Sequence, residues 1–215
     1  GLKLVISGIL QSPHFLYRLE FGEPSAEGAL AVKLTDFEIA SRLSFFLWSS
    51  MPDTALFEAA ERGELQSPAQ IELQARRMIE DPKARRAVAH FYTQWLGLSS
   101  LPELAKNTAL FPEWSPRIGH AMVQEVIALA QHLTWDAEAG IHSLFNTPVS
   151  FLNGPLASFY GVPGINGDEF QQIEFDPQQR NGIMTRGGVM AVHAKANQGS
   201  PILRGVFVRE RILCQ

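Results

Sequence analysis

The strongest constraint on the fold of this chain is a helix-start signal that recurs along it. A serine followed by proline occurs at four places, at Ser12, Ser67, Ser115 and Ser200. Serine before a helix accepts a hydrogen bond from a free backbone N–H, and proline suits the first helical position because its missing N–H has no partner there. Asp81-Pro82 places a carboxylate in the same position. A chain with so many helix starts is expected to be mostly α-helical.

The segments after these signals have the apolar spacing of amphipathic helices. Thr35 with Glu38, and Ser67 with Gln70, have the spacing of capping boxes. The spacing predicts a helix over 36–48 whose apolar face holds Ile39, Leu43, Phe46 and Leu47 and is widened by Phe45 and Trp48. It also predicts a last helix over 200–213 whose buried stripe holds Ile202, Leu203, Val206, Phe207 and Leu213.

The composition changes after residue 137, where glycine, proline and asparagine become frequent. Within this stretch we expect a short helix capped by Asn153, and the best strand candidate is 170–175. The predicted fold is a mostly α, multi-helix bundle with an irregular Gly/Pro/Asn-rich segment and at most one or two short strands. We expect three parts: a helical bundle domain at 1–137, an irregular connecting segment packed on it at 138–178, and two closing helices at 179–215.

Composition and charge exclude several classes of protein. Apolar residues make up 46% of the chain, charged residues 19%, and the net charge is -4, so a basic face for coating nucleic acid is not expected. No stretch approaches the ~20 apolar residues of a membrane span. The first ten residues lack the long apolar core and cleavage site of a signal peptide. We therefore expect a piece of a longer protein.

Metal, thiol and nucleophile motifs are absent from the sequence. The 6 histidines form no HxH, HxxxH or HExxH pattern, so no metal site is predicted. The single cysteine, Cys214, excludes an internal disulfide and a self-contained zinc–thiolate site. Ser200 lacks a GxSxG context and is interpreted as a helix cap. With Arg186 or Arg204 nearby, that helix start could hold an anion.

A few charged residues lie in apolar surroundings and need partners. Isolated charge in a protein interior is costly, so such residues are expected to pair. We expect Arg42 to pair with Glu20 or Glu125. The alternative is that Glu20, Arg42, Glu125 and His193 converge on a catalytic pocket, together with Arg204.

Longer strings in the chain resemble one known pair of families. They are ILQSPHFLYRLE (9–20), LTDFEIASRLSFFLWSSMPD (34–53), ARRMIEDPKARRAVAHFYTQWLGL (75–98), FLNGPLASFYGV (151–162) and RGGVMAVHAKANQGSPILRGVFVRERILC (186–214). In this order they resemble the paired domains of unknown function 1592 and 1588 of large exported bacterial proteins, notably planctomycete-type ones. The residues that match the family pattern are Glu20, Arg42, Trp48, Pro52, Asp53, Trp95, Asn153, Tyr160, Gly161, Ser200, Pro201, Arg204 and Gly205.

The resemblance implies a setting in which haem c is attached elsewhere in the protein. In such proteins a proline-rich stretch and a CxxCH haem motif follow the last string, so the full-length protein is expected to be exported and to carry haem c. With one cysteine, this chain cannot attach haem covalently itself. Within the resemblance, Arg204, with Gly205 and Ser200, is the candidate contact to a haem propionate or another anion. Glycine within a helix costs ~1 kcal/mol relative to alanine, so Gly205 is expected to allow a close approach of another backbone or a cofactor. His193 is a candidate distal haem ligand.

Three functional hypotheses follow. The first is a helical scaffold module that positions a haem domain of the same protein or docks a redox partner in electron transfer. The second is an enzyme domain, an oxidoreductase or hydrolase, acting on an extracellular polymer or a small organic substrate. The third is a protein-interaction module.

Overall fold

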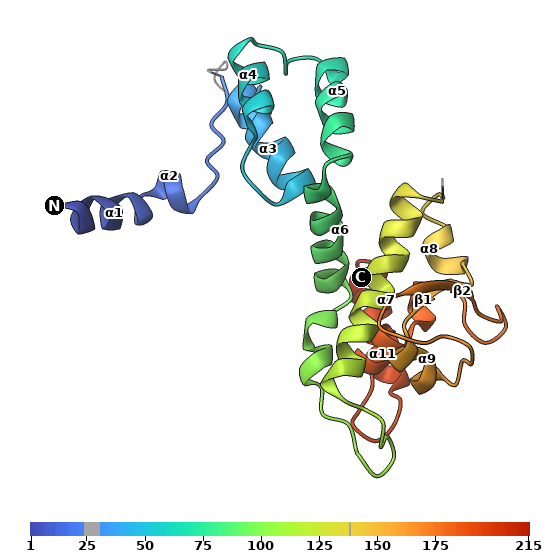
Figure 1. The fold of residues 1–215 in the computed structure, drawn as a ribbon. Coiled ribbons are helices and arrows are strands. Elements are labelled where there is room, and N and C mark those ends of the chain that lie inside the picture. Colours follow the sequence, from blue (N-terminus) through green and yellow to red (C-terminus); the bar gives the residue numbers. More distant parts are fainter. Residues whose placement is uncertain (24–30, 138) are drawn as a thin grey trace. The chain divides into compact units, whose positions relative to one another are not determined.

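The computed structural model describes residues 1–23, 31–137 and 139–215, and these are mostly helical (Figure 1). The predicted fold class is confirmed, because the described residues form many helices and only one sheet, which has two antiparallel strands. The chain forms two compact units, Gly1–Ala87 and Val88–Gln215. Residue 138, where the connecting segment was expected to begin, lies outside the described residues. The three expected domain limits remain a prediction.

The first unit is built from short helices whose starts follow the predicted caps. Thr35 and Ser67 both form complete capping boxes, and the Asp53 side chain accepts from the Leu56 N–H at 2.9 Å. The helices are α1 (Leu2–Leu10), α2 (Pro13–Leu16), α3 (Asp36–Trp48), α4 (Thr54–Glu61), α5 (Pro68–Ile79) and the first residues of α6 (Pro82–Trp95). Ser12 precedes α2 without a side-chain cap.

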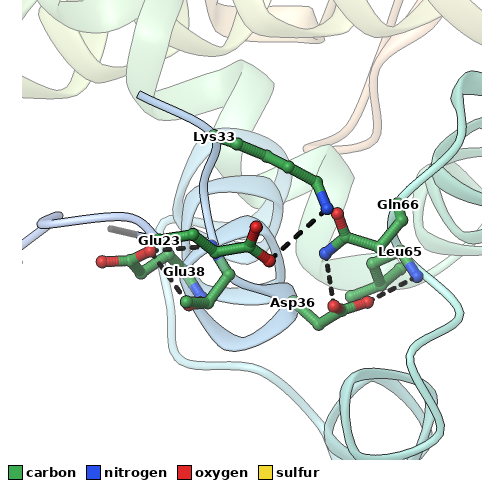
Figure 2. Close-up of polar contacts among 7 residues, drawn as sticks. Glu23, Lys33, Asp36, Glu38, Leu65 and Gln66 are labelled. Carbon is green, nitrogen blue, oxygen red and sulfur yellow. Dashed lines mark hydrogen bonds and ion pairs between the residues drawn. The ribbon is translucent and has the colours of Figure 1, made fainter. Parts of the chain in front are cut away.

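Two carboxylates at the start of α3 hold neighbouring segments to this helix (Figure 2). Glu38 accepts backbone N–H bonds from Phe21 at 2.7 Å, Gly22 at 2.9 Å and Thr35 at 2.8 Å. These bonds stabilise the ionised form and lower the Glu38 pKa from 4.5 to about 2. Asp36 accepts from the Leu65 N–H at 2.8 Å and from the Gln66 side-chain amide.

The buried face of α3 differs from the predicted one. Ala40, Ser44 and Trp48 are buried, whereas Phe46 is 80% exposed. The Trp48 Nε1 donates to the Met78 carbonyl at 2.8 Å, which fixes this large ring against α5. The expected burial of Trp48 is confirmed. The placement of Phe46 was wrong, because two residues along an α-helix turn by about 200°, so Phe46 and Trp48 lie on opposite sides.

The second unit is built around the long helix α7 (Pro116–Trp135), which contacts η1 (Leu98–Glu103), α8 (Ser143–Asn146), β1 (Val149–Leu152), α9 (Gly154–Tyr160) and α10 (Gly187–Val192). The unit also contains β2 (Gln171–Glu174), η2 (Ile183–Thr185), α11 (Pro201–Phe207) and a π-helical turn, η3 (Val208–Ile212).

The sheet of this unit lies against α7 through β1. It pairs β1 with β2 in antiparallel register, with Val149 opposite Glu174 and Leu152 opposite Gln171. The predicted strand at 170–175 and the helix capped by Asn153 are both confirmed. The core collects leucines of η1, the inner face of α7, and Leu152 and Leu156.

The last helix buries less apolar surface than its sequence predicted. Phe207 is 5% exposed, but Ile202 is 79% exposed and Leu203, Val206 and Leu213 are each at least 44% exposed. The prediction of a continuous buried stripe was wrong. Within α11 only Phe207 is buried, and Leu213 follows a π-turn whose spacing differs from that of an α-helix.

The described residues contain neither a membrane-spanning helix nor a cluster of metal ligands. Over ranges 1–23, 31–137 and 139–215, no helix is both long and apolar enough to cross a bilayer. Over the same ranges, no three His, Cys, Asp or Glu side chains gather as metal ligands would.

Candidate functional site

The second unit contains a pocket of about 350 Å³ whose walls combine cations with aromatic rings. It is formed by the segment before α7, the inner face of α7, the end of α9, the start of α10, the loop after α10, and α11. Its lining residues are Lys106, Phe111, Trp114, Met122, Phe159, Tyr160, Arg180, Gly187, Met190, Ala191, Ala194, Lys195, Gln198, Gly199 and Arg204. Four of these side chains are cationic and none is acidic.

Arg204 enters the pocket from the first turn of α11. Ser200 caps this helix by accepting from the Leu203 N–H at 3.3 Å, which orients the turn that carries Arg204. The Arg204 Nη1 contacts only the weak acceptor Sδ of Met190, at 3.5 Å, and its Nε is buried without a partner. Within the described part of the chain, Arg204 forms no salt bridge.

Arg180 forms a second cationic wall, held by aromatic rings. Its guanidinium carbon lies 4.0 Å from the centre of the Tyr160 ring and 5.0 Å from that of Phe175. Stacking on two aromatic faces is a favourable placement for a partly desolvated guanidinium. Its Nη1 is buried without a hydrogen-bond partner.

Lys106 ties the loop after α10 to the pocket. Its Nζ donates to the Ala191 carbonyl at 2.9 Å and to the Lys195 carbonyl at 3.1 Å. An ammonium group carries three N–H donors, so one is left over. Burial lowers the pKa of Lys106, because the charged form loses hydration.

A buried carboxylate lies beneath the pocket floor. The Tyr160 hydroxyl donates to Glu125 Oε2 at 2.7 Å, and the Ser150 hydroxyl donates to Glu125 Oε1 at 2.7 Å. Glu125 is fully buried, and desolvation raises its pKa. Burial, and then Glu125, raise the pKa of Tyr160 well above its ordinary value, so its hydroxyl stays protonated.

Arg186, also fully buried, lies near this network and is fixed by β1. Its Nη2 donates to the Thr147 carbonyl at 2.9 Å and to the Val149 carbonyl at 2.7 Å. Burial lowers the pKa of Arg186, and the charge of Glu125 opposes that shift. The sequence had offered Arg186 as an anion contact beside Ser200, but the structure uses it to hold β1.

Two glycines leave room for the pocket side chains. A Cβ built on Gly187 would lie 2.8 Å from Cζ and 2.9 Å from Cε1 of Tyr160, and closer still to its hydroxyl. A Cβ built on Gly199 would lie 3.1 Å from Nη2 of Arg204. Both distances are shorter than ordinary contacts, so a larger residue at either position would displace a pocket side chain.

The candidates named from sequence are distributed over both units. Glu20 and Arg42 form the expected ion pair in the first unit, with Arg42 Nε at 3.1 Å from Glu20 Oε1. This lowers the pKa of Glu20. Arg204 lies in the pocket, and Glu125 lies below it.

His193 does not line the pocket. Its ring stacks on Phe207 with centroids 4.1 Å apart, and its Nε2 is buried without a partner. Burial lowers its pKa. Gly205 was thought to permit a close approach, but in the described chain nothing lies within 4 Å of a Cβ built there.

The pocket partners of Arg204 were not identified from sequence. Lys106 and Arg180 belong to loops without a motif, far from Arg204 along the chain. The Asn-Gly pair that follows Arg180 is typical of a turn. This signal does not identify which cationic side chains meet in the fold.

Fold and site together define a mostly helical protein with a cation-lined, partly aromatic pocket and no described metal centre. The family model described as protein of unknown function DUF1592 (PSD4) matches residues 34–162, and the chain belongs to this family. A second model, protein of unknown function DUF1588 (PSCyt3), matches residues 180–215. The resemblance inferred from the sequence is therefore confirmed. No curated protein and no solved structure matches the chain.

Proposed function

We propose that the chain is a binding module of a larger exported protein linked to c-type haem, and that its pocket docks an acidic group of the haem-bearing domain. One observation carries the proposal: the pocket has four cationic lining residues and no acidic one. A pocket whose lining holds cations and no acidic side chain favours an anionic occupant.

The link to haem rests on the family rather than on the pocket. The name of the model that matches residues 180–215, PSCyt3, supports an association with cytochromes. A haem presents two propionate carboxylates at its edge, and Arg204 lies within the segment that this model covers. Arginine is suited to carboxylates because its planar fork can donate two parallel N–H bonds.

The test uses the longer haem-bearing protein with Arg204→Ala. Removing a cation beside a propionate should lower the reduction potential of the haem, because the positive charge favours the reduced state. Arg209→Ala is the matched control, since Arg209 is exposed in the same terminal segment and does not line the pocket. An unchanged haem spectrum and potential in Arg204→Ala would reject the docking proposal.

A further inference from the structure

We infer that the pocket selects one chemical class of ligand, a small organic carboxylate carried on a flat apolar body. This inference deepens the docking proposal above, because it names the group that the pocket recognises. It rests on the cations that line the pocket, on the absence of acidic side chains from that lining, and on the aromatic walls around it.

The lining cations favour a carboxylate. Arg204, which has no acidic partner in the described chain, lines the same pocket as Lys106, whose ammonium group has one N–H left over. A guanidinium can donate two parallel N–H bonds to the two oxygens of a carboxylate, and an ammonium group can add a third contact.

Two neutral donors of the walls are already engaged. The Trp114 Nε1 donates to the Leu104 carbonyl at 2.8 Å, and the Tyr160 hydroxyl donates to Glu125. Gln198 is the remaining neutral amide side chain of the lining. Inorganic sulfate or phosphate would pair with the cations but leave the aromatic walls uncovered, and a neutral polyol would bring no charge to the cations.

The apolar walls select the body of the ligand. Phe111, Trp114 and Phe159 line the pocket together with Met122 and Met190. The Trp114 and Phe159 rings meet edge to face with centroids 6.2 Å apart, which fixes both orientations. A volume of about 350 Å³ accommodates a single ring with a short acidic chain.

The experiment measures binding of 3-phenylpropionate to the whole chain by isothermal titration calorimetry. The neutral amide, 3-phenylpropionamide, and inorganic sulfate are the comparison probes. We expect 3-phenylpropionate to bind and the other two to bind at least about ten-fold more weakly, because each lacks either the charge or the apolar body.

Variants locate the site. Arg204→Gln should weaken binding of 3-phenylpropionate by about ten- to hundred-fold, because it removes a charged donor. Arg204→Lys, which keeps the charge but loses the fork, should give a smaller loss. Gly199→Ala should weaken binding by displacing Nη2 of Arg204. Arg209→Gln should leave the dissociation constant unchanged, and circular dichroism checks that every variant is folded.

Three outcomes overturn the inference: no binding of 3-phenylpropionate, equal binding of the neutral amide, or equal binding of sulfate. Its failure is separate from that of the docking proposal. If carboxylate binding depends on Arg204 while the haem potential does not, the ligand class stands and the docking proposal fails. If the haem potential responds while no carboxylate binds, the reverse holds.

Discussion

Two helical glycines of the second unit should respond in opposite ways to the same substitution. Gly187 begins α10 and Gly205 lies within α11. A Cβ at Gly187 would press into the Tyr160 ring, whereas a Cβ at Gly205 would meet nothing within 4 Å. Gly187→Ala is therefore expected to destabilise the protein and Gly205→Ala to stabilise it.

The magnitudes follow from the contacts. To accept a methyl group at Gly187, the Tyr160 ring must move away from Glu125, whose hydrogen bond with it is 2.7 Å long. Losing that bond costs about 1–3 kcal/mol, and overpacking adds about 1–3 kcal/mol. Replacing glycine by alanine in a helix returns up to about 1 kcal/mol. Gly187→Ala should thus lose about 1–5 kcal/mol, and Gly205→Ala should gain about 0.5–1 kcal/mol.

Urea unfolding followed by far-UV circular dichroism measures both free energies of unfolding, with unchanged slopes as the test that the unfolded states are comparable. A double-mutant cycle then tests the cause. In the Tyr160→Phe background, which lacks the nearest clashing atom, Gly187→Ala should cost at least about 1 kcal/mol less than in the wild type. Equal stability of Gly187→Ala and wild type, or an unchanged cost in the Tyr160→Phe background, would refute the steric account.

Two further predictions concern the first unit. The fold lowers the Glu38 pKa from 4.5 to about 2. The stability that Glu38 contributes should therefore be complete above pH 4.5 and decline as the pH falls toward 2. Urea unfolding midpoints measured across this range should decline less steeply in Glu38→Gln than in the wild type. Asp53→Ala should cost about 1–2 kcal/mol through loss of the α4 cap. Asp53→Asn, which keeps the cap and loses the ion pair with Arg77, should cost about 0.5 kcal/mol. Equal losses of stability for Asp53→Ala and Asp53→Asn in thermal melts would contradict the capping account.

Local interactions explain which parts of the fold were predictable. The capping boxes at Thr35 and Ser67, and the caps at Asn153 and Ser200, each join residues at most three positions apart. Such contacts are encoded in short sequence windows and were read correctly. The ion pair of Glu20 with Arg42 was also expected, but from the cost of burying charge, whereas the Arg42 side chain is 61% exposed.

Helix orientation was harder to predict, since it depends on distant partners. In α3 the apolar spacing suggested a wide face that held both Phe46 and Trp48, but Trp48 reaches the carbonyl of Met78 and is buried while Phe46 is exposed. In α11 the spacing assumed a continuous α-helix, and the turn after Phe207 is a π-helix. Apolar spacing identifies that a helix is amphipathic, while the packing partner decides which face is covered.

The glycines of the pocket region also depend on distant partners. Gly205 was expected to allow a close approach beside Arg204, yet the space around Gly205 is open. The glycines that do shape the pocket are Gly187 and Gly199, which make room for Tyr160 and Arg204. Neither has a positive φ or a turn that would require glycine. Their reason is a side chain that comes from elsewhere in the chain, so the sequence alone does not distinguish them from Gly205, which has no such neighbour.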